Sequence, residues 1–215
     1  VESGLPKAVI RDLSLARTRA IRFKLATDLD TSLALAVAAM LQRQRHRVAM
    51  PGVDLAAHAS RITDFDEFAD IVAQAEQAVP EGARMLEWCL VQTRGTLLRI
   101  LAAVTAQAVD LTHERGAPGD RERQTLADTL CEALRIDMKE FWQADDIFWT
   151  RLPKSELLSV LHDSPAMDNL SEKQREAHRK AFSKLKKDEL AIRAAAAYAR
   201  DIYVPDMFVP EPLAG

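Results

Sequence analysis

The sequence has few of the residues that break helices or cross-link a chain. Its 215 residues include seven glycines and two cysteines, and aromatic residues make up 6% of the total. Cys89 and Cys131 are far apart and form no CxxC motif, so the pattern does not favour a disulfide framework and instead predicts a reducing, cytoplasmic setting. Both cysteines lie among apolar helical positions, where we expect small core residues.

Hydrophobic runs long enough to cross a membrane are also missing. The longest are residues 33–41 and 96–111, and Arg99, Gln107 and Asp110 interrupt the second one. Neither is long enough and apolar enough to cross a bilayer, so we expect no membrane partner. No charged segment precedes an apolar stretch and a small-residue cleavage site, which would mark a secreted protein. The chain begins at a valine, and we expect it to be part of a longer protein.

The sequence lacks the common motifs of enzyme and cofactor sites. It contains no GxxxxGK[ST], GxGxxG or GxSxG. The histidines form no HxxxH or HExxH pair, which zinc sites on helices require. They are His46, His58, His113, His162 and His178. His58 and His113 fall in predicted loops, where we expect them to be solvated. We therefore predict no catalytic, cofactor-binding or metal-binding residue, while the assignment of the whole protein as enzyme or non-enzyme stays open.

Alanine and leucine are abundant, and no segment alternates Val, Ile, Thr and Tyr as strands do. The sequence predicts an all-α fold, a multi-helix bundle of about eight to ten helices that can divide into two helical subdomains. The clearest loop is 113–123, which combines glycine, proline and alternating charge. We expect a helical subdomain over 1–112, this loop, a C-terminal helical subdomain over 124–204, and an extended tail over 205–215 that its prolines keep from forming helix.

The first half of the chain shows five helical patterns. One follows Pro6 to about Lys24 and carries a basic face of Arg11, Arg17, Arg19, Arg22 and Lys24. A second, capped by Asp28 or Asp30, should form an antiparallel hairpin with it. A surface loop is predicted over 48–63, and Asp64 is a plausible cap for the next helix. Another helix covers 83–92, followed by a turn at Gly95. The helix from Thr96 to about Thr112 is apolar nearly all round and should lie at the centre of a bundle.

The Phe-Trp pair occurs twice, seven residues apart, in the segment 137–161. Two of the three tryptophans are used here, so the segment serves either as core or as a recognition surface. The intervening sequence QADD favours a break into two short helices, with Asp145 capping the second. Both pairs then form a hydrophobic joint, which is the interpretation that aromatic burial favours.

Charge is distributed unevenly, although the formal net charge is only −3. Residues 1–50 and 171–200 are basic and 51–150 acidic, so a basic patch is compatible with the total. The strongest local signal is a basic helix over 172–187, with Ser171 and Gln174 as its capping box. Its lysines at steps of seven, four and three share one face and can neutralise DNA phosphates. The alternative is a solvated surface helix whose charge is partly paired by Glu172 and Glu176.

The C-terminal part of the chain resembles the helical region at the end of plasmid-type ParB-like partition proteins, a family often labelled ParB-like nucleases. The similarity covers about 124–200 well and 1–45 and 84–111 more weakly, and it is absent over 48–64. The matching residues are Leu134, Ile136, Asp137, Met138, Phe141, Trp142, Arg151, Leu152, Lys154, Leu185, Lys186 and Lys187. The arginine-rich box and the helix-turn-helix of the family have no counterpart in this chain.

The resemblance implies a plasmid or chromosome partition protein whose C-terminal part self-associates and makes auxiliary contact with double-stranded DNA. It also implies a homo-oligomer, such as a dimer, and a partition ATPase as partner. The residues expected at DNA are Lys154, Lys173, Arg179, Lys180, Lys184, Lys186 and Lys187. Two alternatives stay open: a protein-interaction domain without DNA affinity, and part of a ParB-like nuclease. The nuclease is the less supported alternative because metal-assisted hydrolysis requires clustered carboxylates or histidines.

Overall fold

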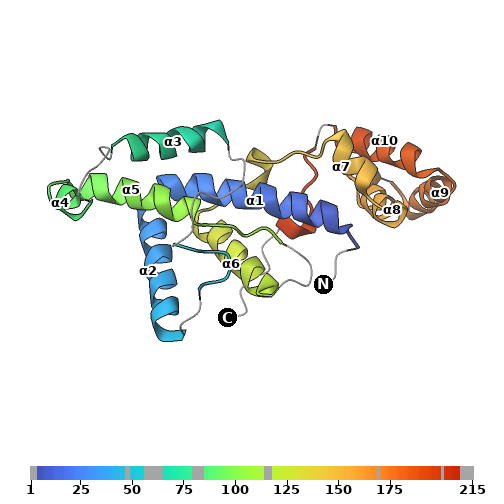
Figure 1. Ribbon diagram of the computed structural model, residues 1–215. Coiled ribbons are helices and arrows are strands. Elements are labelled where there is room, and N and C mark those ends of the chain that lie inside the picture. The colour runs from blue at the N-terminus through green and yellow to red at the C-terminus, as the bar shows by residue number, and fades with distance from the viewer. Residues whose placement is uncertain are drawn as a thin grey trace. The chain divides into compact units, whose positions relative to one another are not determined.

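Helices make up nearly all the regular structure in the computed structural model, which describes residues 4–46, 49–55, 65–78, 85–113, 118–168, 170–199 and 201–208. The all-α prediction is confirmed, because these residues form ten α-helices and three short 3-10 turns but no strand. The α-helices are α1 (Lys7–Thr27), α2 (Leu29–His46), α3 (Asp66–Gln77), α4 (Met85–Leu90), α5 (Arg94–Gln107), α6 (Asp120–Ala133), α7 (Asp146–Arg151), α8 (Lys154–His162), α9 (Glu172–Ser183) and α10 (Lys187–Ala197), as labelled in Figure 1.

The described residues fall into two compact units. The α7–α10 unit comprises residues 4–13 and 139–208, and the α1–α6 unit comprises residues 14–138. The division therefore lies elsewhere than the predicted loop 113–123. The reason is that α6, which follows this loop, contributes Ala127, Leu130 and Cys131 to the same core cluster as Ile21 of α1. Burial of one continuous apolar cluster holds these segments in one unit.

Helices α1 and α2 begin where the sequence predicts. Asp28 caps α2, since its Oδ1 accepts a hydrogen bond from the backbone N–H of Thr31 at 2.9 Å. The predicted antiparallel hairpin is wrong, because α1 runs across the view of Figure 1 and α2 runs down it. The apolar positions of α2 pack against α5 instead. The inner face of α2 buries Leu35, Ala36 and Ala39.

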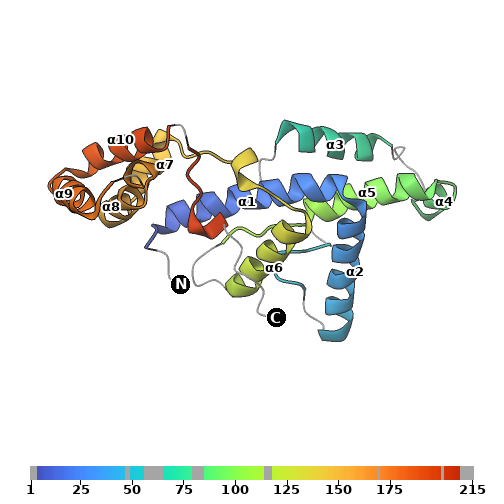
Figure 2. The ribbon, with the colours of Figure 1, turned by 180° about the vertical axis from the view of Figure 1, so that it is seen from behind.

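The basic face predicted for α1 is only partly exposed. Arg17 and Arg22 are 4% and 2% exposed. Arg17 Nε donates to Cys131 Sγ of α6 at 3.3 Å, and its Nη2 pairs with Asp128. Arg22 lies with its guanidinium carbon 5.0 Å from the ring centre of Phe68 in α3, a cation–π contact. These two arginines therefore pack within the unit against different helices, because α6 and α3 lie along different sides of α1 in both views (Figure 1 and Figure 2).

Helix α5 starts two residues before the predicted position, since Thr93 Oγ1 accepts from the backbone N–H of Thr96 at 3.1 Å. Gly95 accordingly lies inside the helix and not in a turn. The helix packs on α2 and α3 and buries Ala102, Ala103, Thr105 and Ala106. The predicted central position is met only on this side, because Val104 is 48% exposed. It ends at Gln107, short of the predicted Thr112.

The described part of the predicted surface loop, residues 49–55, packs beside the end of α5. Asp110 N donates to Gly52 O at 2.8 Å and Asp54 N donates to Ala108 O at 3.0 Å, which draws the chain out of the helix. Gly52 has φ of 81°, and a Cβ there would lie 2.5 Å from Leu111 Cδ2, so the position requires glycine. Val53 is buried. The predicted cap Asp64 lies outside the described residues.

The α7–α10 unit is built around six aromatic rings. The prediction that the Phe-Trp pairs form core is confirmed for Phe148 and Trp149, which are buried, whereas Phe141 and Trp142 are half-buried. Trp142 lies edge-on to Phe148 and to Phe208, at 5.0 and 5.3 Å between ring centres. Trp149 stacks on Tyr198 at 6.0 Å and meets Tyr203 at 5.2 Å. Asp145 caps α7 as predicted, accepting from Phe148 N at 2.7 Å. The predicted tail is not wholly extended, because residues 206–208 form a turn that buries Phe208.

Candidate nucleic-acid interface

Helix α9 is the most exposed long helix of its unit, since none of its twelve residues is buried. Its start is fixed by the predicted capping box, in which Gln174 Oε1 accepts from the backbone N–H of Ser171 at 2.9 Å. Phe182 and Arg175 are half-buried and face the rest of the unit, where α9 packs on α8. The remainder of the helix surface is left to charged side chains and to solvent.

The single helix predicted over 172–187 is wrong. Helix α9 ends at Ser183, Lys184 is its C-cap, and α10 begins at Lys187 after Lys186 in an extended conformation. The side chain of Glu189 caps the new helix, with its Oε2 accepting from Lys186 N at 2.8 Å. We call residues 184–187 the basic turn. Three of its four residues are lysines, and they therefore lie at a helix junction and not on one helix face.

Lys154 holds this junction from the start of α8. Its Nζ donates to the backbone carbonyl oxygens of Ser183 at 3.1 Å and Leu185 at 2.7 Å. Carbonyls at the end of a helix have no partner within it, and the dipole there favours a cation. The structure therefore shows that Lys154 positions the basic turn. Contact of Lys154 with DNA stays a prediction.

Two arginines of α9 are also engaged. Arg175 Nε and Nη2 donate to the carbonyl oxygens of Leu170 and Asp168, each at 3.1 Å, and so fix the segment before the helix. Arg179 Nη1 lies 3.4 Å from Glu172 Oε1 and 4.0 Å from Glu176 Oε2. The predicted pairing with the two glutamates is thus present, and it involves Arg179.

The lysines at positions 173, 180, 184 and 187 are exposed, and within the described part of the chain they form no ion pair. Lys173 and Lys180, seven residues apart, share a face of α9, and Lys184 follows Lys180 by one turn. Residues 171–187 contain seven Lys and Arg against two Glu. We call these four lysines, which follow the predicted spacing of seven, four and three residues, the lysine set. Such a set can neutralise phosphates and displace their counterions without reading bases.

Bases of a single strand would need an exposed aromatic surface on which to stack. The ring that accompanies the lysine set, Phe182, is half-buried and lies 5.8 Å from the ring of His178. No stacking platform is present on the described surface of α9. The chemistry of this surface therefore suits the sugar-phosphate backbone of a duplex.

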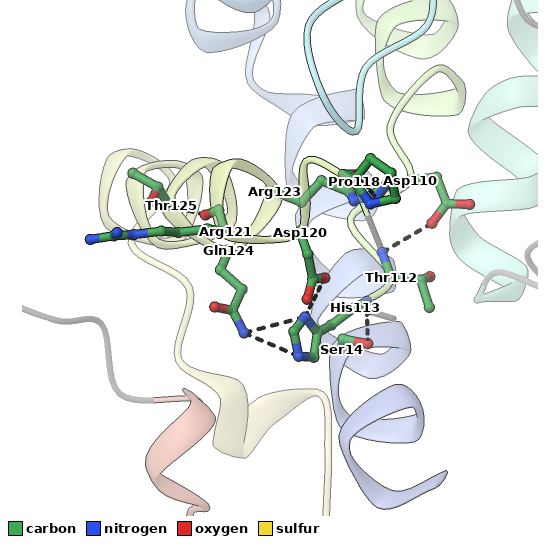
Figure 3. A network of polar contacts seen from close by, with 10 residues as sticks. All are labelled: Ser14, Asp110, Thr112, His113, Pro118, Asp120, Arg121, Arg123, Gln124 and Thr125. Carbon is green, nitrogen blue, oxygen red and sulfur yellow. Dashed lines mark hydrogen bonds and ion pairs between the residues drawn. The ribbon is translucent and has the colours of Figure 1, made fainter. Parts of the chain in front are cut away.

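A second polar cluster lies in the α1–α6 unit and centres on His113 (Figure 3). His113 Nδ1 pairs with Asp120 Oδ1, and the two side chains are 11% and 14% exposed. Gln124 Nε2 lies 3.4 Å from the same ring nitrogen, and His113 N donates to Ser14 Oγ at 2.8 Å. The expectation of a solvated His113 is wrong, because α6 begins at Asp120, four residues before its predicted start, and brings this carboxylate to the ring.

The cluster around His113 connects the segment after α5 to the first turn of α6 and to α1. The hydroxyl of Ser14, a residue that is 3% exposed, accepts from the backbone N–H of His113. Acyl-transfer chemistry needs a nucleophile whose side chain is hydrogen-bonded to the imidazole. The contact between His113 and Ser14 uses the histidine backbone instead, so it holds the two segments together. One signal for the pair is present in the sequence, because an acidic residue, Asp120, follows Gly119 in the first helical turn.

The described residues contain no group of three or more His, Cys, Asp and Glu side chains arranged to hold a metal ion. Cys131 is buried, as predicted, and Cys89 is half-buried, both as free thiols. Burial raises the pKa of the Cys131 thiol, and the neighbouring Arg17 guanidinium opposes part of this effect. The thiol is thereby kept in its neutral, unreactive form.

Among the described helices, none has the length and apolar character needed to span a membrane.

Comparisons with protein families, curated proteins and solved structures found no match for this chain.

Proposed function

We propose that this chain is the helical C-terminal region of a DNA-binding partition protein of the ParB-like type, acting in self-association and in auxiliary contact with duplex DNA. The observation that supports DNA contact is the lysine set on α9 and the basic turn, which is exposed and unpaired in a protein whose formal net charge is −3. The resemblance of residues 124–200 to the partition family supports the biological context, including a partition ATPase as partner.

The lysine set is built on a stable frame, which favours a binding surface over an incidental charge run. The capping box fixes the start of α9, Arg175 ties down the preceding segment, and Lys154 holds the junction at its end. Each of these contacts restrains the backbone that carries the exposed lysines. A surface whose charges are already positioned loses less conformational entropy when it binds.

The test is binding of the purified chain to a fluorescently labelled duplex at low salt. We expect charge reversal of Lys180 and Lys184 together to weaken binding by at least tenfold, since each loses a favourable phosphate contact and gains a repulsive one. The matched control reverses Arg94 and Arg99, two exposed arginines of α5 that change the net charge equally. An affinity that is unchanged by K180E/K184E would refute DNA contact through this surface.

The protein-interaction alternative rests on a different observation, the exposed apolar side chains of α2. It predicts a stable oligomer that does not retain DNA at any salt concentration. Both proposals include self-association, so DNA binding by a preparation that light scattering shows to be oligomeric separates them. The nuclease alternative has no supporting observation among the described residues, and nicking of plasmid DNA that is lost on chelation would be the result that restores it.

A further inference from the structure

Helix α2 is apolar on the face that it turns to solvent. Residues 31–42 contain no charged side chain. The inner face buries Ser32, Leu35 and Ala36 against the rest of the unit, whereas Leu33, Val37 and Met40 are 37%, 45% and 59% exposed. A surface helix normally carries charged residues on its outer face, and one that is apolar all round is normally covered. Helix α9 of the same chain shows the ordinary charged pattern.

The three exposed side chains form a single stripe. They are separated by four and three residues, the spacing that places side chains one above another on a helix. We call Leu33, Val37 and Met40 the α2 stripe. Ala34 and Ala38 flank it and are too small to keep another helix at a distance, so a partner helix can approach to the shorter end of the usual range of about 8–10 Å between axes.

Charge along α2 indicates what covers the stripe. Asp28 and Asp30 lie at the start of the helix, and Arg43 and Arg45 lie in its last two turns. A second α2 in antiparallel orientation would place the acidic start of each helix beside the basic end of the other, and would also oppose the two helix dipoles favourably. A parallel arrangement would place like charges together at both ends.

The stripe also has the symmetry that such a pair needs. Residues 36 and 37 lie near the middle of α2, which extends over 18 residues. A two-fold axis passing between them places Val37 close to its own copy, and Leu33 of one chain opposite Met40 of the other. The same patch then serves both partners, as a closed dimer requires.

We propose that the α2 stripe is a self-association surface, which pairs antiparallel with the α2 stripe of a second copy of this chain. The inference rests on the self-association in the proposed function and names the surface for it. A helix of 18 residues is about 27 Å long. Two such helices bury less than a standard interface of about 800 Å² per partner, so the dimer dissociates on dilution, at a concentration of about 10–100 µM.

Sedimentation of the chain over a range of concentrations around this value measures the dimer. The wild type shifts from one chain to two as the concentration rises, and Val37→Glu stays at one chain, with an affinity reduced at least tenfold. The control is Ile192→Glu, because Ile192 of α10 is 70% exposed and lies in the other unit. Far-ultraviolet circular dichroism checks that each variant keeps its helices.

Cysteine cross-linking tests the antiparallel register in a Cys89→Ser background. V37C cross-links to its own copy on oxidation. L33C and M40C do not do so alone, since each lies about 10 Å along the axis from its copy and a disulfide needs Cα atoms within about 7 Å. A mixture of differently tagged L33C and M40C chains does cross-link. Cross-linking of L33C to itself would show a parallel pair and overturn the proposal.

Two further results would contradict the inference in different ways. A dimer that survives Val37→Glu shows that the chain associates through another surface, so that the proposed function stands and this interface does not. A wild type that remains a single chain throughout the concentration range removes both the interface and the self-association, and assigns the stripe to a different protein. DNA binding by the monomer is measured separately and is unaffected by either result.

Discussion

The side-chain nitrogen of Lys154 lies 2.7 Å from the backbone carbonyl oxygen of Leu185, at the junction between α9 and α10. The same ammonium also donates to Ser183 O, so one cation at the start of α8 satisfies two carbonyls where α9 ends. Lys154 was predicted to contact DNA directly. Its position in the structure indicates that it acts on the lysine set by holding the turn that carries it.

Replacing Lys154 by methionine keeps the aliphatic stem and removes the ammonium. We expect the free energy of unfolding of the α7–α10 unit to fall by about 1 kcal/mol, because two charge-assisted hydrogen bonds are lost at an exposed site. Denaturant titration followed by tryptophan fluorescence measures this in a Trp88→Phe background, where Trp142 and Trp149 report on this unit. Lys180→Met, which removes an exposed lysine without such contacts, should cost less than about 0.5 kcal/mol. Equal losses in the two variants would contradict the positioning role.

The two cysteines should differ in reactivity in the folded protein. A thiol-specific reagent at a pH of about 8 should label Cys89 in the native state and Cys131 only after unfolding, since burial raises the pKa of Cys131 and shields its sulfur. Counting labelled thiols by mass spectrometry, with and without denaturant, checks this. In the Cys131→Ala variant, the thiol that is labelled only after unfolding should be absent. Equally rapid labelling of both thiols would show that α6 does not pack on Arg17 as described.

Both tyrosines of the chain lie in the aromatic core of the α7–α10 unit. Burial, followed by nearby carboxylates, raises the pKa of Tyr203 and of Tyr198 above the ordinary value of about 10. The folded state thus favours the neutral phenols. Stability from this source is fully present below a pH of about 10 and is lost as the pH rises above it.

Denaturant titration of this unit at pH values of about 8 and 11 measures that loss, and tyrosinate absorbance measures the ionisation itself. The variant with both Tyr198 and Tyr203 changed to phenylalanine should lose much less stability between the two pH values. The same pH dependence in the variant and the wild type would mean that the tyrosines are not buried in this core.

Local signals predicted several features correctly because the causes lie within a few residues. Asp145 and Ser171 cap their helices through side-chain contacts with residues three positions further along the chain. The large aromatic side chains of the Phe-Trp pairs favour burial, which predicts a core. The break between α9 and α10 was missed. It depends in part on Lys154, which is 31 residues from Leu185, and helical spacing alone continues through it.

Other predictions were wrong where tertiary packing overrides the pattern of charged and apolar residues in the sequence. Arg17 and Arg22 are charged and belong to the predicted basic face of α1, but Asp128 with Cys131 and the ring of Phe68 provide partners that make their burial possible. The lysine set shows the reverse case. Sequence spacing identified its members, and only the structure distinguishes the four unpaired lysines from Arg179, which pairs with glutamate, and Lys154, which holds the turn.

The most direct test of DNA contact is the salt dependence of duplex binding. We predict that the logarithm of the association constant falls linearly with the logarithm of salt concentration, and that changing Lys180 and Lys184 to alanine reduces the slope by about 2, because each lysine accounts for about one displaced counterion. Changing Arg94 and Arg99 to alanine should leave the slope unaltered. A slope that is the same for the wild type and the Lys180→Ala/Lys184→Ala variant would contradict the assignment of this surface to DNA.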